Sequence, residues 1–350
     1  MDKKLLPRHA AGSFELHGGT GGITGMCSCG EFLEMYKVDK TYRVQSPERI
    51  DPDQTNPNAM WVITPISDVG SRSPIVSRIL LQGSEILKAA WFEREIEKDE
   101  VISLLHACKE DLLVCDQIAK RISTEVSKIM LKVQTEGITS EKGRALNPFP
   151  HVQNLTNECD NFLIKAKRVI KHICTLPFIF FELPREDNNF EHLFISLSSV
   201  LDNDHLFLKD FIIPNTPYIK HIIELRNFQE HPKKHKKTII ENFKLTVDNK
   251  NIVVPQWNIT GEEPCSITEE MEAIVNFLLE VAEIMFINVV MNSVKKEIPF
   301  VIERVPDADI NLDAPIKFNL SIDLNVSAKP TPSTQGQRIN SNYVVLKTKE

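Results

Sequence analysis

The chain has 350 residues, of which 42% are hydrophobic and 25% charged, as in an ordinary soluble globular protein. Its length fits two or three domains, or one domain with extensions. The formal net charge of −7 argues against a protein that coats nucleic acid through its overall charge, so any RNA or DNA contact needs a local basic patch.

The first half of the chain predicts two different regions. Residues 1–72 combine HGGTGG, MCSCG and a proline-rich stretch with strand-like runs at 36–44 and 61–66, and they predict an irregular, β-containing N-terminal arm. Residues 73–150 predict a helical region and a linker. Ser73 and Pro74 form an N-cap and first-turn pair, apolar residues continue at helical spacing to about residue 135, and the pattern then breaks.

Residues 151–296 predict a block of four helices. We expect them over 152–181, with Pro177 ending or kinking the helix, then over 190–212, 217–231 and 266–294. Thr216-Pro217 predicts the start of the third helix, and Pro232 its end. Two β-rich runs around Asp248 predict a hairpin inserted before the last helix. Residues 297–350 predict a β-rich tail, with strand-like runs at 298–304, 316–326 and 342–347 and a flexible polar segment between the last two.

The most apolar run, residues 273–291, is interrupted by Asn276, Glu280, Glu283 and Asn288. Two carboxylates near the middle argue against a lipid-spanning helix and predict a buried core helix. One or both carboxylates are candidates to accept hydrogen bonds from the third helix, including Arg226. We expect no membrane contact.

Seven cysteines are present, an odd number, and most lie within apolar helical patterns. This usage favours a reducing compartment over a secreted disulfide framework. The first residues, MDKKLLPRHAAGSFELHGG, have no apolar core of the kind a signal peptide requires. The sequence therefore predicts a cytoplasmic protein.

The stretch IIELRNFQEHPKKHKK, residues 222–237, holds the main candidate site. Residues five apart on an α-helix differ by about 140° around its axis. Arg226 and His231 can therefore meet only if the last turn loosens before Pro232. Arginine offers planar donors suited to a phosphodiester, and histidine exchanges a proton near neutral pH. Together they suit RNA cleavage by a ribose 2′-hydroxyl, with histidine as acid or base and arginine on the phosphate.

The segment from Leu225 to His231 resembles the motif of the HEPN superfamily, in which an arginine, often followed by a polar residue, precedes a histidine near the end of the third helix of a four-helix bundle. The resemblance covers residues 152–295. Lys233 stands where many ribonuclease members have a tyrosine.

The resemblance implies a mainly α protein with a HEPN-like four-helix bundle core, an extra N-terminal long-helix region, a β-hairpin insert and a small β-rich tail. It implies a metal-independent endoribonuclease without a cofactor, with Arg226 and His231 as the catalytic pair and Asn227 as the polar neighbour. Members act as homodimers, often in toxin–antitoxin or antiviral systems, so RNA and an antitoxin or other protein are the implied partners. Other members with this fold only bind RNA or protein.

Two other interpretations of the motif stand beside this one. Arg226 can form a surface ion pair with Glu230 one turn later, while His231 and the lysines complement the negative end of the helix dipole. The site can also bind phosphate without cleaving RNA.

Lys233, Lys234, Lys236 and Lys237 make a basic cluster beside the motif. The cluster can bind an RNA backbone, or it can be a solvated loop that leads into the hairpin. At the N-terminus, Cys27 and Cys29 with His17 lack the second ligand pair of a structural zinc site, so we expect no metal there.

Overall fold

The computed structural model describes residues 15–137, 145–181, 183, 188–202, 205–248 and 250–323. The chain divides into two compact units, each built from segments that are separated in the sequence. Unit 1 comprises 1–109, 176–182 and 282–350, and unit 2 comprises 110–175 and 183–281.

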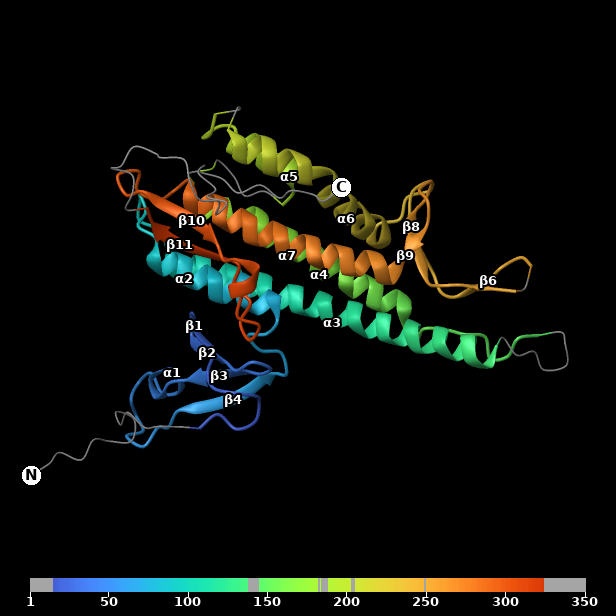
Figure 1. The fold of residues 1–350 in the computed structure, drawn as a ribbon, viewed down its shortest axis with the longest axis horizontal. Coiled ribbons are helices and arrows are strands. Elements are labelled where there is room, and N and C mark those ends of the chain that lie inside the picture. Colours follow the sequence, from blue (N-terminus) through green and yellow to red (C-terminus); the bar gives the residue numbers. More distant parts are fainter. Residues whose placement is uncertain are drawn as a thin grey trace, which may run out of the picture. The chain divides into compact units, whose positions relative to one another are not determined.

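Unit 1 contains a four-stranded antiparallel sheet in which each strand pairs with the next (Figure 1). Its strands are β1 (Gly25–Cys29), β2 (Phe32–Tyr36), β3 (Thr41–Gln45) and β4 (Val62–Ser67), with the short helix α1 (Pro47–Ile50) between the last two. The side chains buried together beside the sheet include Leu16, Met35, Tyr42 and Val44. Alternation along β2 and β3 therefore gives the sheet an apolar face.

The helical part of unit 1 begins with the π-helical turn η2 (Val76–Leu81), which continues into α2 (Gln82–Ala89). Gly83 allows close packing there, since a Cβ atom at this position would lie 2.7 Å from the Leu105 side chain. Helix α2 packs against β11 of the hairpin formed by β10 (Phe300–Arg304) and β11 (Phe318–Ile322), with the short η4 (Asp307–Asp309) between them (Figure 1).

A buried polar network joins α2 to the last long helix, α7 (Ile267–Met291), and to β11. Glu283 accepts hydrogen bonds from Arg78 Nε at 3.0 Å and from Gln82 Nε2 at 2.8 Å. Gln82 Oε1 in turn accepts from the backbone N–H groups of Lys317 and Phe318. The expectation that the α7 carboxylates bond to Arg226 is wrong for Glu283, whose partners are these.

Unit 2 holds most of the long helix α3 (Lys98–Glu136) and of α4 (Leu155–Phe180), followed by α5 (Phe190–Leu197), the π-helical turn η3 (Phe207–Ile212) and α6 (Ile213–Glu230). Two small sheets follow, formed by β5 (Thr238–Glu241), β8 (Gln256–Ile259) and β9 (Cys265–Ser266), and by β6 (Lys244–Leu245) and β7 (Ile252–Val253). The fully buried Trp257 of β8 packs against Phe162 of α4, with ring centroids 6.2 Å apart.

The predicted mainly α fold with a HEPN-like four-helix bundle is wrong. The protein is a mixed α/β fold, about 50% helical with 17% strand, and the strands among its described residues form four separate small sheets. The sequence underestimates the strand content because the described strands are only two to six residues long, too short for a clear alternating pattern.

Several element predictions are confirmed, namely the long helix ending near residue 135, the hairpin around Asp248 and the first two strands of the tail. The predicted helix start at Thr216-Pro217 is wrong, because α6 follows η3 directly and contains Pro217. In the turn before the proline, the side chains of Asn215 and Thr216 donate to the carbonyls of Phe211 and Ile212. The predicted strand at 342–347 and the flexible segment before it lie outside the described residues.

Among the described residues, one helix, α7, is long and apolar enough to cross a membrane by length and composition, and 83% of that apolar stretch is buried inside the protein. The predicted cytoplasmic location and the predicted four-part domain division remain predictions.

Candidate functional site

Arg226, Asn227 and His231 lie at the C-terminal end of α6. The helix ends at Glu230, and the N–H of His231 still donates to the carbonyl of Asn227 at 2.8 Å. The backbone of His231 leaves the helical region, with φ −126° and ψ 67°, because Pro232 disfavours a helical residue before it. The last turn therefore opens at the histidine, as the sequence predicts.

This opening brings the arginine and the histidine to one carboxylate. The guanidinium of Arg226 forms an ion pair with Oε2 of Glu230, and Nε2 of His231 lies 3.5 Å from the same oxygen. The side chain of His231 is 73% exposed, whereas that of Arg226 is 20% exposed. Two side chains that a regular helix would separate thus converge on one anionic oxygen.

A further cation comes from α4. The Oδ1 atom of Asn227 accepts a hydrogen bond from Lys167 Nζ at 2.9 Å and a longer one from Arg226 at 3.4 Å. Burial and the neighbouring Arg226 charge lower the pKa of Lys167 from its usual range. Sequence reasoning missed Lys167, because it lies 59 positions before Arg226 in a lysine- and arginine-rich helix that gives no local signal.

The lysine cluster forms a tight turn after the helix. Backbone hydrogen bonds join Lys233 and Lys236 in both directions, at 2.9 and 3.2 Å. Their ammonium groups lie 5.8 and 4.6 Å from the ring centroid of Phe228, and Lys236 Nζ is 3.8 Å from a Glu224 oxygen. Lys234 and Lys237 are exposed in the same segment. The turn thus presents several cations to solvent beside the end of α6.

This arrangement can bind an anionic group. Arg226, Lys167 and the lysine turn supply positive charge, and the guanidinium is suited to two phosphate oxygens at once. The Glu230 carboxylate occupies the position that a phosphate oxygen would take between Arg226 and His231. An incoming phosphate would therefore have to displace Glu230, whose side chain is 45% exposed.

The structure contains an observation that favours the ion-pair interpretation of the motif and another that favours a phosphate or catalytic site. The Arg226–Glu230 ion pair considered from the sequence alone is present, and so is the convergence of Arg226, Asn227 and His231. The sequence did not indicate that His231 shares the Glu230 oxygen. The catalytic role of the residues and the RNA contacts of the lysines remain predictions.

A second polar cluster in unit 2 surrounds Glu270 of α7. Its carboxylate accepts from Nε2 of His221 at 2.8 Å, from the indole N–H of Trp257 and from the Cys265 thiol. Tyr218 stacks on the His221 ring, with centroids 6.1 Å apart. This cluster ties α6 to α7 and β8, and its bonded groups indicate a structural role.

Comparison with models of protein families, with curated proteins and with solved structures finds no match. The case for a function therefore rests on the geometry of the chain itself.

Proposed function

We propose that the protein binds RNA at the end of α6 and cleaves it without a metal ion. The observation that carries the proposal is the convergence of Arg226 and His231 on one anionic oxygen, that of Glu230. A phosphodiester oxygen in this position would lie against the guanidinium with an exposed imidazole beside it. The proposal rests on this local resemblance to the HEPN motif and not on a bundle fold.

Each residue has a separate role in the proposed reaction. His231 takes the proton from a ribose 2′-hydroxyl or gives one to the leaving 5′-oxygen. Arg226 neutralises the charge that develops on the phosphorus oxygens, and Asn227 holds the side chains of Arg226 and Lys167 in place. Lys233, Lys234, Lys236 and Lys237 bind the flanking backbone, which makes affinity depend on salt.

Cleavage assays on the purified full-length protein test the proposal. We expect cleavage of single-stranded RNA in EDTA, with 2′,3′-cyclic phosphate ends, and its loss in folded His231→Ala and Arg226→Ala variants. His235→Ala is a matched control, since this exposed histidine lies four residues from His231. Arg121→Ala, which breaks an ion pair with Glu158, is the control for the arginine. Cleavage that survives in His231→Ala would overturn the catalytic assignment.

The second candidate is RNA binding without cleavage. The Arg226–Glu230 ion pair favours it, because the carboxylate occupies the guanidinium and lies beside the imidazole. Salt-dependent RNA binding that weakens in Arg226→Ala, with no cleavage by any variant, would support this candidate over the nuclease.

The homodimer implied by the resemblance belongs to the same proposal, as do the cytoplasmic location and a defence setting with an antitoxin or other protein partner. A dimer would bring two copies of the motif to one RNA strand. Sedimentation measurements with and without RNA test this part, and a monomer under both conditions would exclude it.

A further inference from the structure

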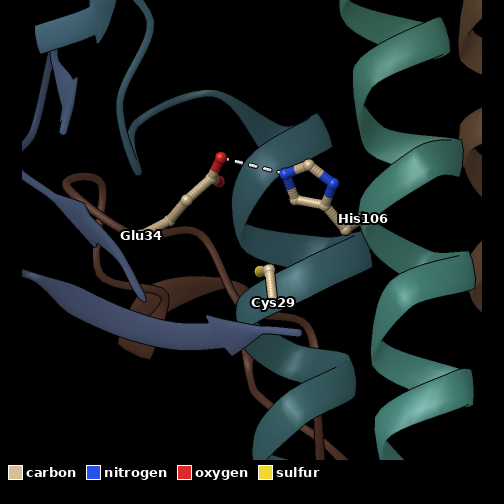
Figure 2. Close-up of side chains that lie close together, drawn as sticks. All are labelled: Cys29, Glu34 and His106. Carbon is tan, nitrogen blue, oxygen red and sulfur yellow. Dashed lines mark hydrogen bonds and ion pairs between the residues drawn. The ribbon is translucent and has the colours of Figure 1, made fainter. Parts of the chain in front are cut away.

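A buried group of potential metal ligands lies in unit 1, far along the chain from the α6 site. Cys29 of β1, Glu34 of β2 and His106 of α3 each present one ligand atom, and the three atoms lie within 4.8 Å of one another. Figure 2 shows the imidazole of His106 and the carboxylate of Glu34 turned toward each other, with Nε2 2.9 Å from Oε1. Cys29 and Glu34 are buried, and His106 is 14% exposed.

The strand register brings a fourth candidate to this place. Cys27 and Cys29 lie two residues apart on β1, so their side chains point to the same face of the sheet, and both are buried. Cys27 pairs directly with Glu34 across β1 and β2. The Cys29 thiol donates to the backbone carbonyl of Cys27 at 3.7 Å. Both thiols and the carboxylate thus share one face.

Other side chains hold the carboxylate in place from its far side. Glu34 Oε2 accepts from Lys109 Nζ at 2.8 Å and from the Tyr36 hydroxyl. Oε1 is the oxygen that faces His106. Bonds of this kind commonly orient metal-binding carboxylates, and they leave one oxygen for the metal. Arg43 lies 3.4 Å from Oε1, but its guanidinium rests on the Phe32 ring at 3.8 Å and can remain there.

We propose that Cys29, Glu34 and His106 bind a zinc ion, with Cys27 as the fourth ligand. Thiolate, imidazole and carboxylate are the ligands that zinc takes in proteins, usually four in a tetrahedron. Zinc bond lengths place such ligands about 3.3 to 3.8 Å apart. His106 Nε2 and Glu34 Oε1, now 2.9 Å apart, would separate slightly, whereas a pair at the 4.8 Å limit would close by about 1 Å. The Cys27 thiol lies outside this group of three and would have to turn toward it.

Charge balance is compatible with this site. Zinc carries two positive charges, and binding it would release one proton from each of Cys27 and Cys29 to solvent. The net charge of the cluster, including Glu34 and Lys109, therefore does not change. A metal here would join β1 and β2 to α3. The site differs from the zinc arrangement considered from the sequence, because it uses Glu34 and His106 in place of His17.

Cobalt titration of the reduced, EDTA-stripped full-length protein tests the proposal. We expect one equivalent of Co²⁺ to produce tetrahedral d–d absorption and a thiolate-to-cobalt charge-transfer band, and Zn²⁺ to remove both. Cys29→Ser and His106→Gln should each lower the affinity at least about tenfold. Cys265→Ser and His172→Gln are matched controls, because each alters a thiol or imidazole that contacts a carboxylate elsewhere.

Circular dichroism shows whether each variant folds. If a variant does not fold, the wild-type titration still tests whether the protein binds cobalt through thiolates. Absence of the cobalt bands in the wild-type protein would overturn the site, and so would bands that persist unchanged in folded Cys29→Ser and His106→Gln. Unchanged affinity in Cys27→Ser would overturn Cys27 as the fourth ligand.

Discussion

Glu230 is the residue that most directly controls the proposed RNA site. Its carboxylate pairs with Arg226 and lies 3.5 Å from His231, so it competes with a phosphate for both groups. We predict that Glu230→Gln raises RNA affinity about three- to tenfold at low salt, because removing one negative charge favours phosphate binding. Exposed ion pairs one helical turn apart contribute about 0.3–0.5 kcal/mol, so stability should change little. Fluorescence anisotropy with labelled RNA measures the change.

The control for this prediction is Glu191→Gln, which removes a carboxylate from an exposed ion pair with Lys220 in the same unit. Its RNA affinity should stay within twofold of the wild type. Affinity that falls in Glu230→Gln would mean that the carboxylate orders the arginine for RNA and does not compete with it.

The His221–Glu270 pair makes stability depend on pH. The hydrogen bond to Glu270 raises the pKa of His221, against the effect of burial. Burial alone would raise the pKa of Glu270, but its hydrogen bonds from His221, Cys265 and Trp257 outweigh burial and lower it. The histidine contribution is complete below about pH 6.5 and is lost as pH rises through the folded-state pKa. The carboxylate contribution is complete above about pH 4.3 and is lost as pH falls.

We therefore predict that His221→Gln reduces the loss of stability between pH 6 and pH 9 by about 1 kcal/mol. Urea unfolding of the variant and the wild type at both pH values measures this difference. His192→Gln, an exposed histidine at the start of α5, should keep the wild-type dependence. Equal pH dependence in His221→Gln and the wild type would show that the imidazolium does not stabilise the fold.

At the scale of elements, the sequence predicts the long helices better than the strands. The apolar spacing in α3 continues through 39 residues, so the helical period is clear. The β1–β2 hairpin has only two turn residues, Gly30 and Glu31, between strands of five residues. Gly30 adopts φ +65°, a conformation that favours glycine in such a turn. In the sequence, however, this glycine follows several others, so it does not stand out as a turn residue.

The end of α6 was predictable and its beginning was not. Pro232 sets the end through a local steric effect, which the sequence carries. Pro217 reads as a helix start, but the helix begins at Ile213 and continues through the proline. Whether a helix continues through a proline depends on the folded backbone around it. Arg226 and Glu230 could be paired from their spacing of four residues, whereas the hydrogen bond from Lys167 to Asn227 joins two helices that are distant in the sequence.

The network between η2, α2 and α7 leads to a prediction about how these elements are joined. Arg78 and Gln82 bond to the buried Glu283, and all three are almost fully buried. We predict that Glu283→Leu destabilises the protein by about 3–5 kcal/mol, because it leaves the Arg78 charge buried without its partner. Urea unfolding measures the loss.

The double variant Arg78→Met with Glu283→Leu is the matched control, since it removes both charges with similar volume. Its stability should lie much closer to that of the wild type, because replacing a whole buried pair with apolar groups is often nearly neutral. A double variant as unstable as Glu283→Leu would indicate that the packing of the side chains matters more than the unpaired charge.

At the scale of the whole molecule, segments distant in sequence combine into the same unit. Residues 176–182 and 282–350 belong to unit 1 with the N-terminal 109 residues, while unit 2 takes the chain between them. Helices α3, α4 and α7 each continue from one unit into the other. Changes of composition do not mark the boundaries after residues 109, 175 and 281, because each of these lies inside a helix. Contacts between distant residues, which one sequence does not reveal, define the units.

The cysteines give a prediction that involves both units. All seven are free thiols, and six of them are buried. The exception, Cys265, is half-buried, and burial and its hydrogen bond to Glu270 raise the pKa of its thiol to about 12. Because the thiolate is the reactive form, we predict that the reduced, metal-free native protein reacts slowly with a thiol reagent at pH 8, whereas all seven thiols react at once in guanidinium.

Absorbance after addition of a chromogenic disulfide reagent counts the thiols under both conditions. Native reaction should follow the rate of opening, so adding sub-denaturing urea should accelerate it. One fast equivalent in the native protein that disappears in Cys265→Ser would show that this thiol is exposed in solution. Fewer than seven equivalents in guanidinium without reductant would indicate a disulfide. That result would contradict the structure, in which all seven cysteines are free thiols.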